Sequence, residues 1–173
     1  MWNYSSMTNP GPETLEVWTA LLVAHRRLTT QLDAELRAGA DMTLDEYDVL
    51  YQLRRAGRPL RMSELASQVL ISRPSTTRVA DHLVQRGWLE RWHDDTDRRV
   101  VLVGLTKEGK RAQARAGRLH LDGITRLVEA PLAGHELRRV AGALRVLAGS
   151  TATVRVDEAP GAAGAPRVPR AVS

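Results

Sequence analysis

A chain of 173 residues is long enough for one domain, or for a small domain that carries oligomerisation helices, and we expect one compact unit. Its 25 Lys and Arg residues exceed its 20 Asp and Glu residues, and the net charge of +5 by itself indicates polyanion binding only weakly. The absence of cysteine excludes disulfide frameworks, iron–sulfur clusters, zinc ribbons and thiol redox switches.

The positive charge is concentrated in one segment. Between Arg58 and Arg118 there are thirteen basic and seven acidic residues, so the rest of the chain is nearly neutral. The first ten residues lack the pattern of a secretory signal, and no apolar run approaches the roughly 18 residues of a transmembrane helix. We therefore expect a soluble, cytoplasmic protein.

A long first helix is predicted from Glu13 to about Ala38. Its apolar residues recur at spacings of three, four and their sums, which is typical of one helical face. They are Leu15, Trp18, Leu22, Leu28, Leu32 and Leu36. Such a stripe requires a partner surface.

The second helix begins with a capping box at Thr43-Leu44-Asp45-Glu46, in which the Thr43 hydroxyl and the Glu46 carboxylate each bind the other residue's backbone amide. We expect this helix to run to about Ala56, where Gly57 supplies a left-handed stop. The segment from Arg58 to Leu60 contains a proline and is short, which favours a turn or an edge strand.

Two short helices are predicted next. Ser63 is the expected N-cap of the third helix, and Ser72 is the expected N-cap of the fourth, which runs from Arg73 to Arg86. Pro74 fits the first turn of a helix, and Gly87 ends it. The inward face is Thr76, Val79, Ala80 and Leu83, which leaves Arg73, Pro74, Ser75, Thr77, Arg78 and Asp81 facing outward.

A hairpin is predicted from Trp88 to His93 and from Arg99 to Leu105, around an acidic turn. Thr106 is the N-cap of a long basic helix that continues to about Ala130, and Pro131 marks a boundary. A last helix, from Gly134 to about Ala148, has apolar residues at heptad-like spacing. The tail from Ser150 has no apolar period and is expected to be disordered.

The fourth helix has the side chains that a helix in the major groove of DNA requires. Short polar groups such as Ser75 and Thr77 suit base edges, whereas cations suit phosphates. Arg73 and Arg78 could each bind a guanine edge or a phosphate, and the phosphate contact is favoured because most protein–DNA hydrogen bonds go to the backbone. Taken without its neighbours, this helix would be an ordinary solvated amphipathic helix.

The hairpin tip, Asp94-Asp95-Thr96-Asp97-Arg98-Arg99, favours DNA binding over that interpretation. An arginine at such a tip can enter a narrow minor groove, where the negative potential is strongest. We expect Asp97 to orient the guanidinium of Arg99 by a charge-assisted bond. The alternative for the isolated turn is an exposed salt bridge of little energetic value.

Taken together, these elements resemble the MarR family of bacterial transcriptional regulators. The resemblance covers about Glu13 to Ala148. It is carried by the segments Ser63-Glu64-Leu65-Ala66, Ser72-Arg73-Pro74-Ser75-Thr76-Thr77-Arg78-Val79, Gly87-Trp88-Leu89-Glu90-Arg91, Asp97-Arg98-Arg99 and Leu105-Thr106-Lys107-Glu108-Gly109. It implies a homodimer with interleaved terminal helices, in which each wing lies in a minor groove beside a major-groove helix. A two-fold protein of this kind would bind a palindrome with half-sites about one helical turn apart.

The predicted fold class is therefore mainly α with a small β-wing: a winged helix-turn-helix domain with N- and C-terminal dimerisation helices. We divide the chain into a flexible N-terminus (1–12), a dimerisation helix (13–42), the DNA-binding domain (43–106), C-terminal dimerisation helices (107–149) and a disordered tail (150–173). The predicted DNA contacts are Ser72, Arg73, Pro74, Ser75, Thr77 and Arg78 on the helix, and Asp97, Arg98 and Arg99 on the wing.

A small-molecule effector is a further hypothesis, because members of the resembled family often release DNA when an aromatic or anionic compound binds. The candidate lining residues are Trp18, His25, Tyr47 and Tyr51. Each also has an ordinary explanation: Trp18 as core, His25 as an interface residue, and the two tyrosines as a packing pair. A metal site is not expected, because the five histidines show no i,i+4 pairing and no thiol is present.

The main functional hypothesis is a dimeric, sequence-specific repressor. An architectural or nonspecific DNA-binding protein would use the same basic surface, and only discrimination between sequences separates the two. A third alternative is a winged protein that has lost DNA binding and docks another protein, against which the arginines at 73, 78, 98 and 99 argue. We expect neither an enzyme nor a cofactor, since no phosphate-binding glycine loop, metal triad or paired nucleophile is present.

Overall fold

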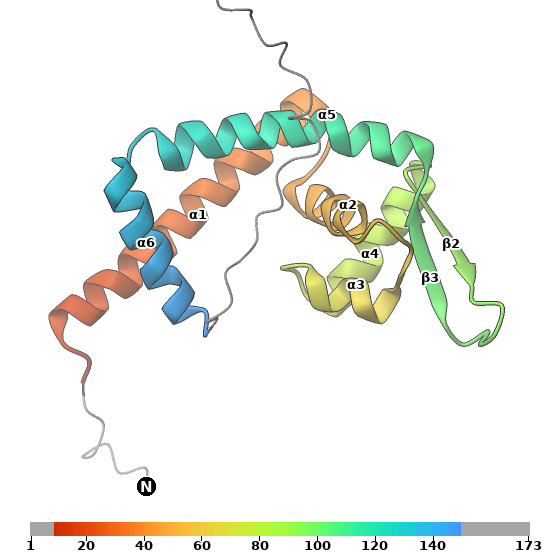
Figure 1. The fold of residues 1–173 in the computed structure, drawn as a ribbon, viewed down its shortest axis with the longest axis horizontal. Coiled ribbons are helices and arrows are strands. Elements are labelled where there is room, and N and C mark those ends of the chain that lie inside the picture. Colours follow the sequence, from red (N-terminus) through yellow and green to blue (C-terminus); the bar gives the residue numbers. More distant parts are fainter. Residues whose placement is uncertain (1–8, 150–173) are drawn as a thin grey trace, which may run out of the picture. The chain divides into compact units, whose positions relative to one another are not determined.

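The computed structural model describes residues 9–149. The expectation of one compact unit is wrong, because the chain divides after Pro131 into two compact units. The first unit consists of helices and a small sheet (Figure 1). Its elements are α1 (Pro12–Ala40), α2 (Leu44–Ala56), β1 (Leu60–Arg61), α3 (Met62–Gln68), α4 (Arg73–Gln85), β2 (Leu89–His93), β3 (Val101–Leu105), α5 (Lys107–Ile124) and the π-helical turn η2 (Thr125–Glu129). This mainly helical fold with a β-hairpin confirms the predicted winged helix-turn-helix class.

The apolar stripe of α1 divides into two halves. Leu32 and Leu36 are buried, whereas Leu15, Trp18 and Leu22 are 51%, 57% and 49% exposed. The buried half packs against α5, and two glycines allow the helices to approach closely (Figure 1). A Cβ atom on Gly39 would lie 2.8 Å from Leu119, and one on Gly123 would lie 2.7 Å from Leu32.

The start and end of α2 confirm the predicted caps. The Thr43 hydroxyl accepts a hydrogen bond from the Glu46 amide at 3.1 Å, and the Glu46 carboxylate accepts one from the Thr43 amide at 2.7 Å. Gly57 ends the helix with a φ of +66°, a left-handed conformation that costs glycine little. Val49, Leu50 and Leu53 carry this helix into the core.

The expected cap of α3 is wrong. Ser63 is not its N-cap, because the helix begins at Met62 directly after strand β1. Leu60 and Arg61 pair with Val103 and Leu102 of β3, which fixes the backbone up to the first helical residue. Ser63 therefore lies inside the first turn. The same pairing confirms that the segment before α3 forms a short edge strand.

The three strands form one antiparallel sheet in the order β1-β3-β2. Residues Leu89 to His93 of β2 pair with Leu105 to Val101 of β3 to form the predicted hairpin. Leu60, Leu89 and Val103 point from the sheet into the core, together with Leu65, Ala80 and Leu83 from α3 and α4. The sheet and the helix-turn-helix thus share one core.

Helix α6 (Gly134–Leu147) is the element of the second unit, close to the predicted bounds. Its Val140, Leu144 and Leu147 side chains are exposed. Residues 1–8 of the expected flexible N-terminus and the expected disordered tail, 150–173, lie outside the described residues. Within residues 9–149, none of the helices has the length and apolar character needed to span a bilayer.

Candidate nucleic-acid interface

Helix α4 begins at a serine cap that also organises its first turn. The Ser72 Oγ accepts a hydrogen bond from the Ser75 amide at 3.4 Å and donates one to the Ser75 Oγ at 2.9 Å. The fully buried Thr76 donates its hydroxyl proton to the Ser72 carbonyl at 3.0 Å. Pro74 lies in this first turn, where no backbone donor is needed. The cap therefore fixes how α4 leaves the turn after α3.

The outward face of α4 agrees with the expectation from sequence, apart from one side chain. Arg73, Pro74, Thr77 and Arg78 are exposed, whereas Ser75 is half-buried and its hydroxyl is paired with Ser72. The Thr77 hydroxyl donates to the Arg73 carbonyl at 3.3 Å and keeps its lone pairs for an outside donor. This face therefore combines two cations with one short hydroxyl.

The wing tip is organised by Asp94. Its Oδ1 accepts hydrogen bonds from the amides of Thr96 at 2.9 Å and Asp97 at 3.1 Å, and also from the Thr96 hydroxyl. The hydroxyl bond and then the two amide bonds hold the pKa of Asp94 below its usual value, so this carboxylate remains ionised at neutral pH. The acidic turn is therefore a structural device that shapes the tip.

The expected pairing between Asp97 and the Arg99 guanidinium is wrong. The Asp97 Oδ1 instead accepts a hydrogen bond from the backbone amide of Arg99 at 3.0 Å. In an Asx-type turn of this kind the carboxylate is hydrogen-bonded to the nearby backbone and does not pair with the Arg99 guanidinium. Arg98 and Arg99 are both exposed, and neither has an ion-pair partner within residues 9–149. Both guanidinium groups are thus free to bind an external anion.

Arg91 of β2 connects the wing to α4, a contact that sequence reasoning missed. Its guanidinium forms an ion pair with Asp81 and donates to the Thr77 carbonyl at 3.3 Å. The Arg91 side chain is largely buried, which strengthens such a pair relative to a fully exposed one. The hairpin and the outward face of α4 are therefore held as one surface.

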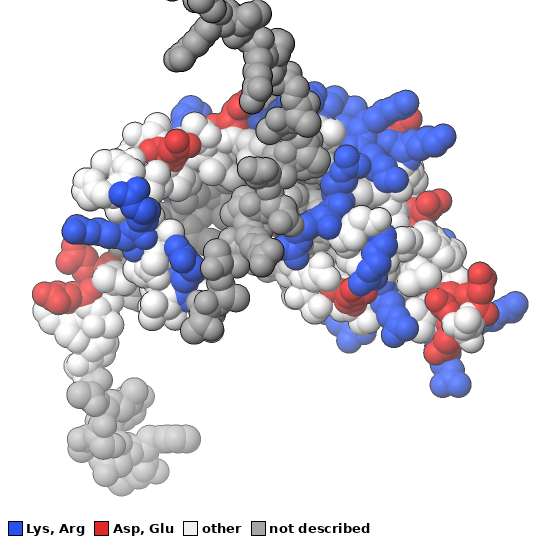
Figure 2. Space-filling view, viewed as in Figure 1, with Lys and Arg blue, Asp and Glu red and all other residues white. Residues whose placement is uncertain are grey.

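Basic side chains gather over this part of the molecule and over the first half of α5, as Figure 2 shows on one face. The hairpin tip combines acidic side chains with basic ones. The exposed basic residues of α5 are Lys107, Lys110, Arg111, Arg115 and Arg118. A surface with this charge attracts a polyanion.

The four candidate effector-lining residues fall into two groups. Tyr47 and Tyr51 of α2 stack with ring centroids 6.1 Å apart, and Tyr47 also contacts His120 of α5 at 4.5 Å. Trp18 and His25 lie on the exposed part of α1, so Trp18 is not a core residue of the single chain. The structure therefore brings the tyrosines together with a histidine that sequence reasoning did not select.

Within this cluster Tyr47 is buried, whereas Tyr51 and His120 are half-buried. Burial, followed by the neighbouring Tyr51 and Asp48, raises the pKa of Tyr47 to about 12. Burial also lowers the pKa of His120, whose Nδ1 has no hydrogen-bond partner within the described part of the chain. This cluster contains uncharged aromatic rings and an unused polar atom at neutral pH.

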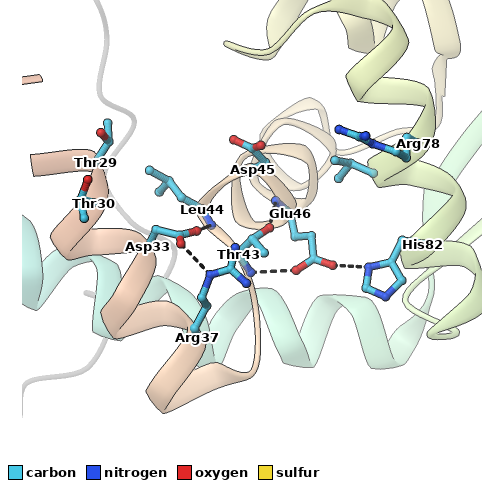
Figure 3. Close-up of a pocket in the computed structure, with 11 residues that line it drawn as sticks. Thr29, Thr30, Asp33, Arg37, Thr43, Leu44, Asp45, Glu46, Arg78 and His82 are labelled. Atoms are coloured by element: carbon cyan, nitrogen blue, oxygen red, sulfur yellow. Dashed lines mark hydrogen bonds and ion pairs between the residues drawn. The ribbon is translucent and has the colours of Figure 1, made fainter. Parts of the chain in front are cut away.

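A separate groove of about 630 Å³ lies between α1, the start of α2 and α4 (Figure 3). Arg78 and His82 of α4 face it, opposite Asp33 and Arg37 of α1, and Glu46 lies between them. None of the four candidate effector residues lines this groove. In residues 9–149 no three His, Asp or Glu side chains lie close enough together to hold a metal ion.

Comparison with known proteins agrees with this geometry. Residues 42–101 match the MarR family, a range that contains both α4 and the wing tip. A solved structure, Sco3205, a MarR family transcriptional regulator from Streptomyces coelicolor in complex with DNA, has a TM-score of 0.75 and 28% sequence identity, and the match covers 81% of this chain and 92% of that one. The chain therefore resembles the MarR family in sequence over residues 42–101 and in fold over 81% of its length.

Two curated relatives match over shorter segments of this chain. PecS of Dickeya dadantii, an HTH-type transcriptional regulator, is 39% identical over 66 residues, which cover 37% of this chain and 40% of PecS. The transcriptional repressor MprA of Escherichia coli K12 is 44% identical over 50 residues, which cover 29% of this chain and 28% of MprA. The matches thus span less than half of either relative.

Proposed function

We propose that this protein is a MarR family regulator, a sequence-specific transcriptional repressor that binds a palindromic operator as a homodimer and is not an enzyme. One observation carries the proposal. Arg98 and Arg99 of the wing, which have no ion-pair partner within residues 9–149, belong to one surface with the exposed Arg73 and Arg78 of α4, and Arg91 joins the two elements. Thr77 on the same face supplies a group suited to base edges. Such a regulator works beside the chromosome, so the proposal includes a cytoplasmic location.

In this proposal α4 enters the major groove and the wing enters the adjacent minor groove. Arg73 and Arg78 then contact phosphates, while Thr77 approaches base edges and Arg99 enters the narrow groove. Ser72 and Pro74 bring the start of α4 close to the sugar–phosphate backbone of the DNA. The relative Sco3205 is a regulator in complex with DNA, which supports a nucleic-acid partner for the same fold.

The exposed apolar half of α1 supports the dimer. Leu15, Trp18 and Leu22 lie on one helical face and are about half exposed, an arrangement that a second copy of the chain would cover. The exposed apolar residues of α6 offer the same opportunity within their own unit. A two-fold dimer would bind half-sites about 34–36 Å apart on one face of the duplex.

Selective retention of DNA tests the proposal. Purified protein is incubated with sheared DNA from its source organism at near-physiological salt, and the retained fragments are sequenced. An enriched inverted repeat supports a dimeric specific regulator, whereas retention without a shared motif supports the alternative of an architectural DNA-binding protein, to which the basic face of α5 is also suited. The variant Arg73→Ala/Arg78→Ala should lose retention, while Arg55→Ala, which removes an exposed charge from α2, serves as the control.

We further propose that a small aromatic or anionic effector releases the DNA. Tyr51 and His120, which lie half-buried beside the buried Tyr47, support this proposal because an aromatic ligand can stack on the exposed part of their rings. Trp18 and His25 would belong to such a site only through a second copy of the chain. Calorimetry with a phenolic library tests it, and DNA binding that no compound affects would contradict it.

A further inference from the structure

A buried carboxylate joins the start of α2 to helix α4. Glu46 is 3% exposed, and both of its oxygens are used (Figure 3). Its Oε2 accepts the Thr43 amide at 2.7 Å, which completes the capping box, while its Oε1 accepts a hydrogen bond from Nδ1 of His82 at 2.6 Å. An ionised carboxylate only accepts hydrogen bonds, so with Glu46 in that form the proton of this bond lies on the His82 Nδ1. The pair therefore links two elements that are 36 residues apart in sequence.

A second contact fastens the same end of α4. Arg86, which follows the last turn of α4, donates from Nη1 to the Asp41 carbonyl at 2.7 Å and from Nη2 to the Asp41 carboxylate at 2.8 Å. Its Nη1 also lies 3.8 Å from the Glu46 Oε1, and its guanidinium stacks on Trp88. Asp41 ends α1 in a left-handed conformation with a φ of +50°. The C-terminal end of α4 is thus held by the corner between α1 and α2.

That corner is itself anchored to α1. Asp33 accepts the Leu44 amide at 2.8 Å through Oδ1 and the Arg37 Nε at 2.6 Å through Oδ2 (Figure 3). Burial tends to raise the pKa of Asp33, but these two hydrogen bonds outweigh it and leave the pKa below its usual value. A continuous set of polar contacts therefore runs from α1 through the start of α2 to α4.

We propose that Glu46 and His82 form a positioning pair that sets the orientation of α4 and thereby the affinity for DNA. This inference rests on the proposed function, in which α4 enters the major groove. His82 lies one helical turn beyond Arg78, so a rotation of α4 that breaks the His82 bond also displaces the Arg78 guanidinium. The His82 side chain is 57% exposed, so its loss removes a geometric restraint with little buried surface.

The test uses variants on each side of the pair. His82→Ala removes the donor, His82→Gln retains an N–H donor, and Glu46→Gln removes the charge but can keep one acceptor for the Thr43 amide. Gln85→Ala alters an exposed residue of the same last turn and is the matched control. Arg78→Ala reports whether α4 binds DNA at all. Affinity is measured on a duplex taken from the retained DNA, and the fold of each variant is checked by circular dichroism.

We expect His82→Ala to weaken DNA binding by about threefold to tenfold, the effect of one net hydrogen bond, with His82→Gln close to wild type. The double variant Glu46→Gln/His82→Ala should be no weaker than the worse single variant, because both act through one contact. Effects that add would overturn the inference, since His82 would then contact DNA directly. Unchanged affinity in His82→Ala together with a loss in Arg78→Ala would overturn it as well, while leaving the proposed function intact.

Unchanged affinity in both His82→Ala and Arg78→Ala would overturn the proposed function of α4 and this inference with it. If Glu46→Gln fails to fold, amide hydrogen exchange of the DNA-free protein replaces the double variant. In His82→Ala the α4 amides should then exchange faster than in wild type, and His82→Gln should restore them. Identical exchange in all three proteins would overturn the inference, because a residue that acts only by touching DNA leaves the free protein unaltered.

Discussion

Two regions of the molecule are exposed but differ in chemistry. One is the surface formed by α4 and the wing, and the other is the N-terminal half of α1. The first presents unpaired arginines, which water solvates well, and the second presents Leu15, Trp18 and Leu22, which water solvates poorly. Burial of apolar area stabilises by roughly 25 cal/mol per Å², whereas exposed cations cost the free protein little. In the proposed regulator, the arginine surface is therefore stable without a partner until DNA binds, whereas the apolar face of α1 is stabilised by a second copy of the chain.

The largest effect should follow a change on α1. Leu22→Glu puts a charge into the face that a second copy would bury, and each dimer would contain two such charges. We expect the dimer dissociation constant to rise by at least about a hundredfold, because burying an unpaired charge costs several kcal/mol. Analytical ultracentrifugation measures it, with Ala24→Glu on the opposite side of α1 as the control. An unaltered dimer would assign the interface to another surface.

A large effect on DNA binding with none on assembly should follow Arg99→Ala. The variant removes an unpaired guanidinium from the wing, and we expect affinity to fall by about tenfold to a hundredfold, as for the loss of one groove contact. Sedimentation should remain that of the unaltered dimer. Arg139→Ala, an exposed arginine of α6, matches the loss of charge elsewhere. Equal affinities for wild type and Arg99→Ala would mean that the wing does not reach DNA.

A smaller effect separates two roles within the arginine surface. Thr77→Ala removes the exposed hydroxyl of α4 and leaves both neighbouring cations in place. We expect affinity for the preferred sequence to fall by about threefold to tenfold, with little change on random DNA, because a base contact acts on sequence and a phosphate contact does not. Competition binding on both duplexes measures the ratio. A uniform loss on both would assign Thr77 to the backbone.

The sequence predicts helix caps, which depend on neighbouring residues, better than contacts between elements that are far apart in the chain. The Thr43 capping box, the Ser72 cap and the left-handed Gly57 were predictable because each depends on residues within a few positions. Ser63 was assigned wrongly as a cap because pairing between β1 and β3, which lies 40 residues away, decides where α3 begins. Long-range order therefore overrode a local preference.

The side-chain contacts that build the arginine surface were not predictable for the same reason. Arg91 meets Asp81, and His82 meets Glu46, only after the helices and the hairpin have packed. Asp97 was expected to bind the Arg99 guanidinium, but the nearer backbone amide of Arg99 takes its carboxylate. Sequence thus predicted which residues face outward and missed what holds them in position.

The smallest effect concerns the packed contact between α2 and α5, which is neither of the two exposed surfaces. Burial lowers the pKa of His120 from 6.5, although Asp48 acts in the other direction. As the pH falls below about 6.5, the unfolded chain therefore takes up a proton on this residue before the folded protein does. The contribution of His120 to stability is full above pH 6.5 and is lost as the pH falls toward its lower value in the folded state.

Urea denaturation between about pH 8 and pH 5 measures that loss as the difference in free energy of unfolding between wild type and His120→Gln. The contributions of the other histidines cancel in this difference. We expect the wild type to lose more stability toward low pH than the variant, by less than about 1 kcal/mol because the ring remains partly exposed. His135→Gln on α6 should follow the wild-type curve. Parallel curves for wild type and His120→Gln would show that His120 is as well solvated as the arginines of α4. The packing of α2 on α5 would then not bury this residue as the lowered pKa requires.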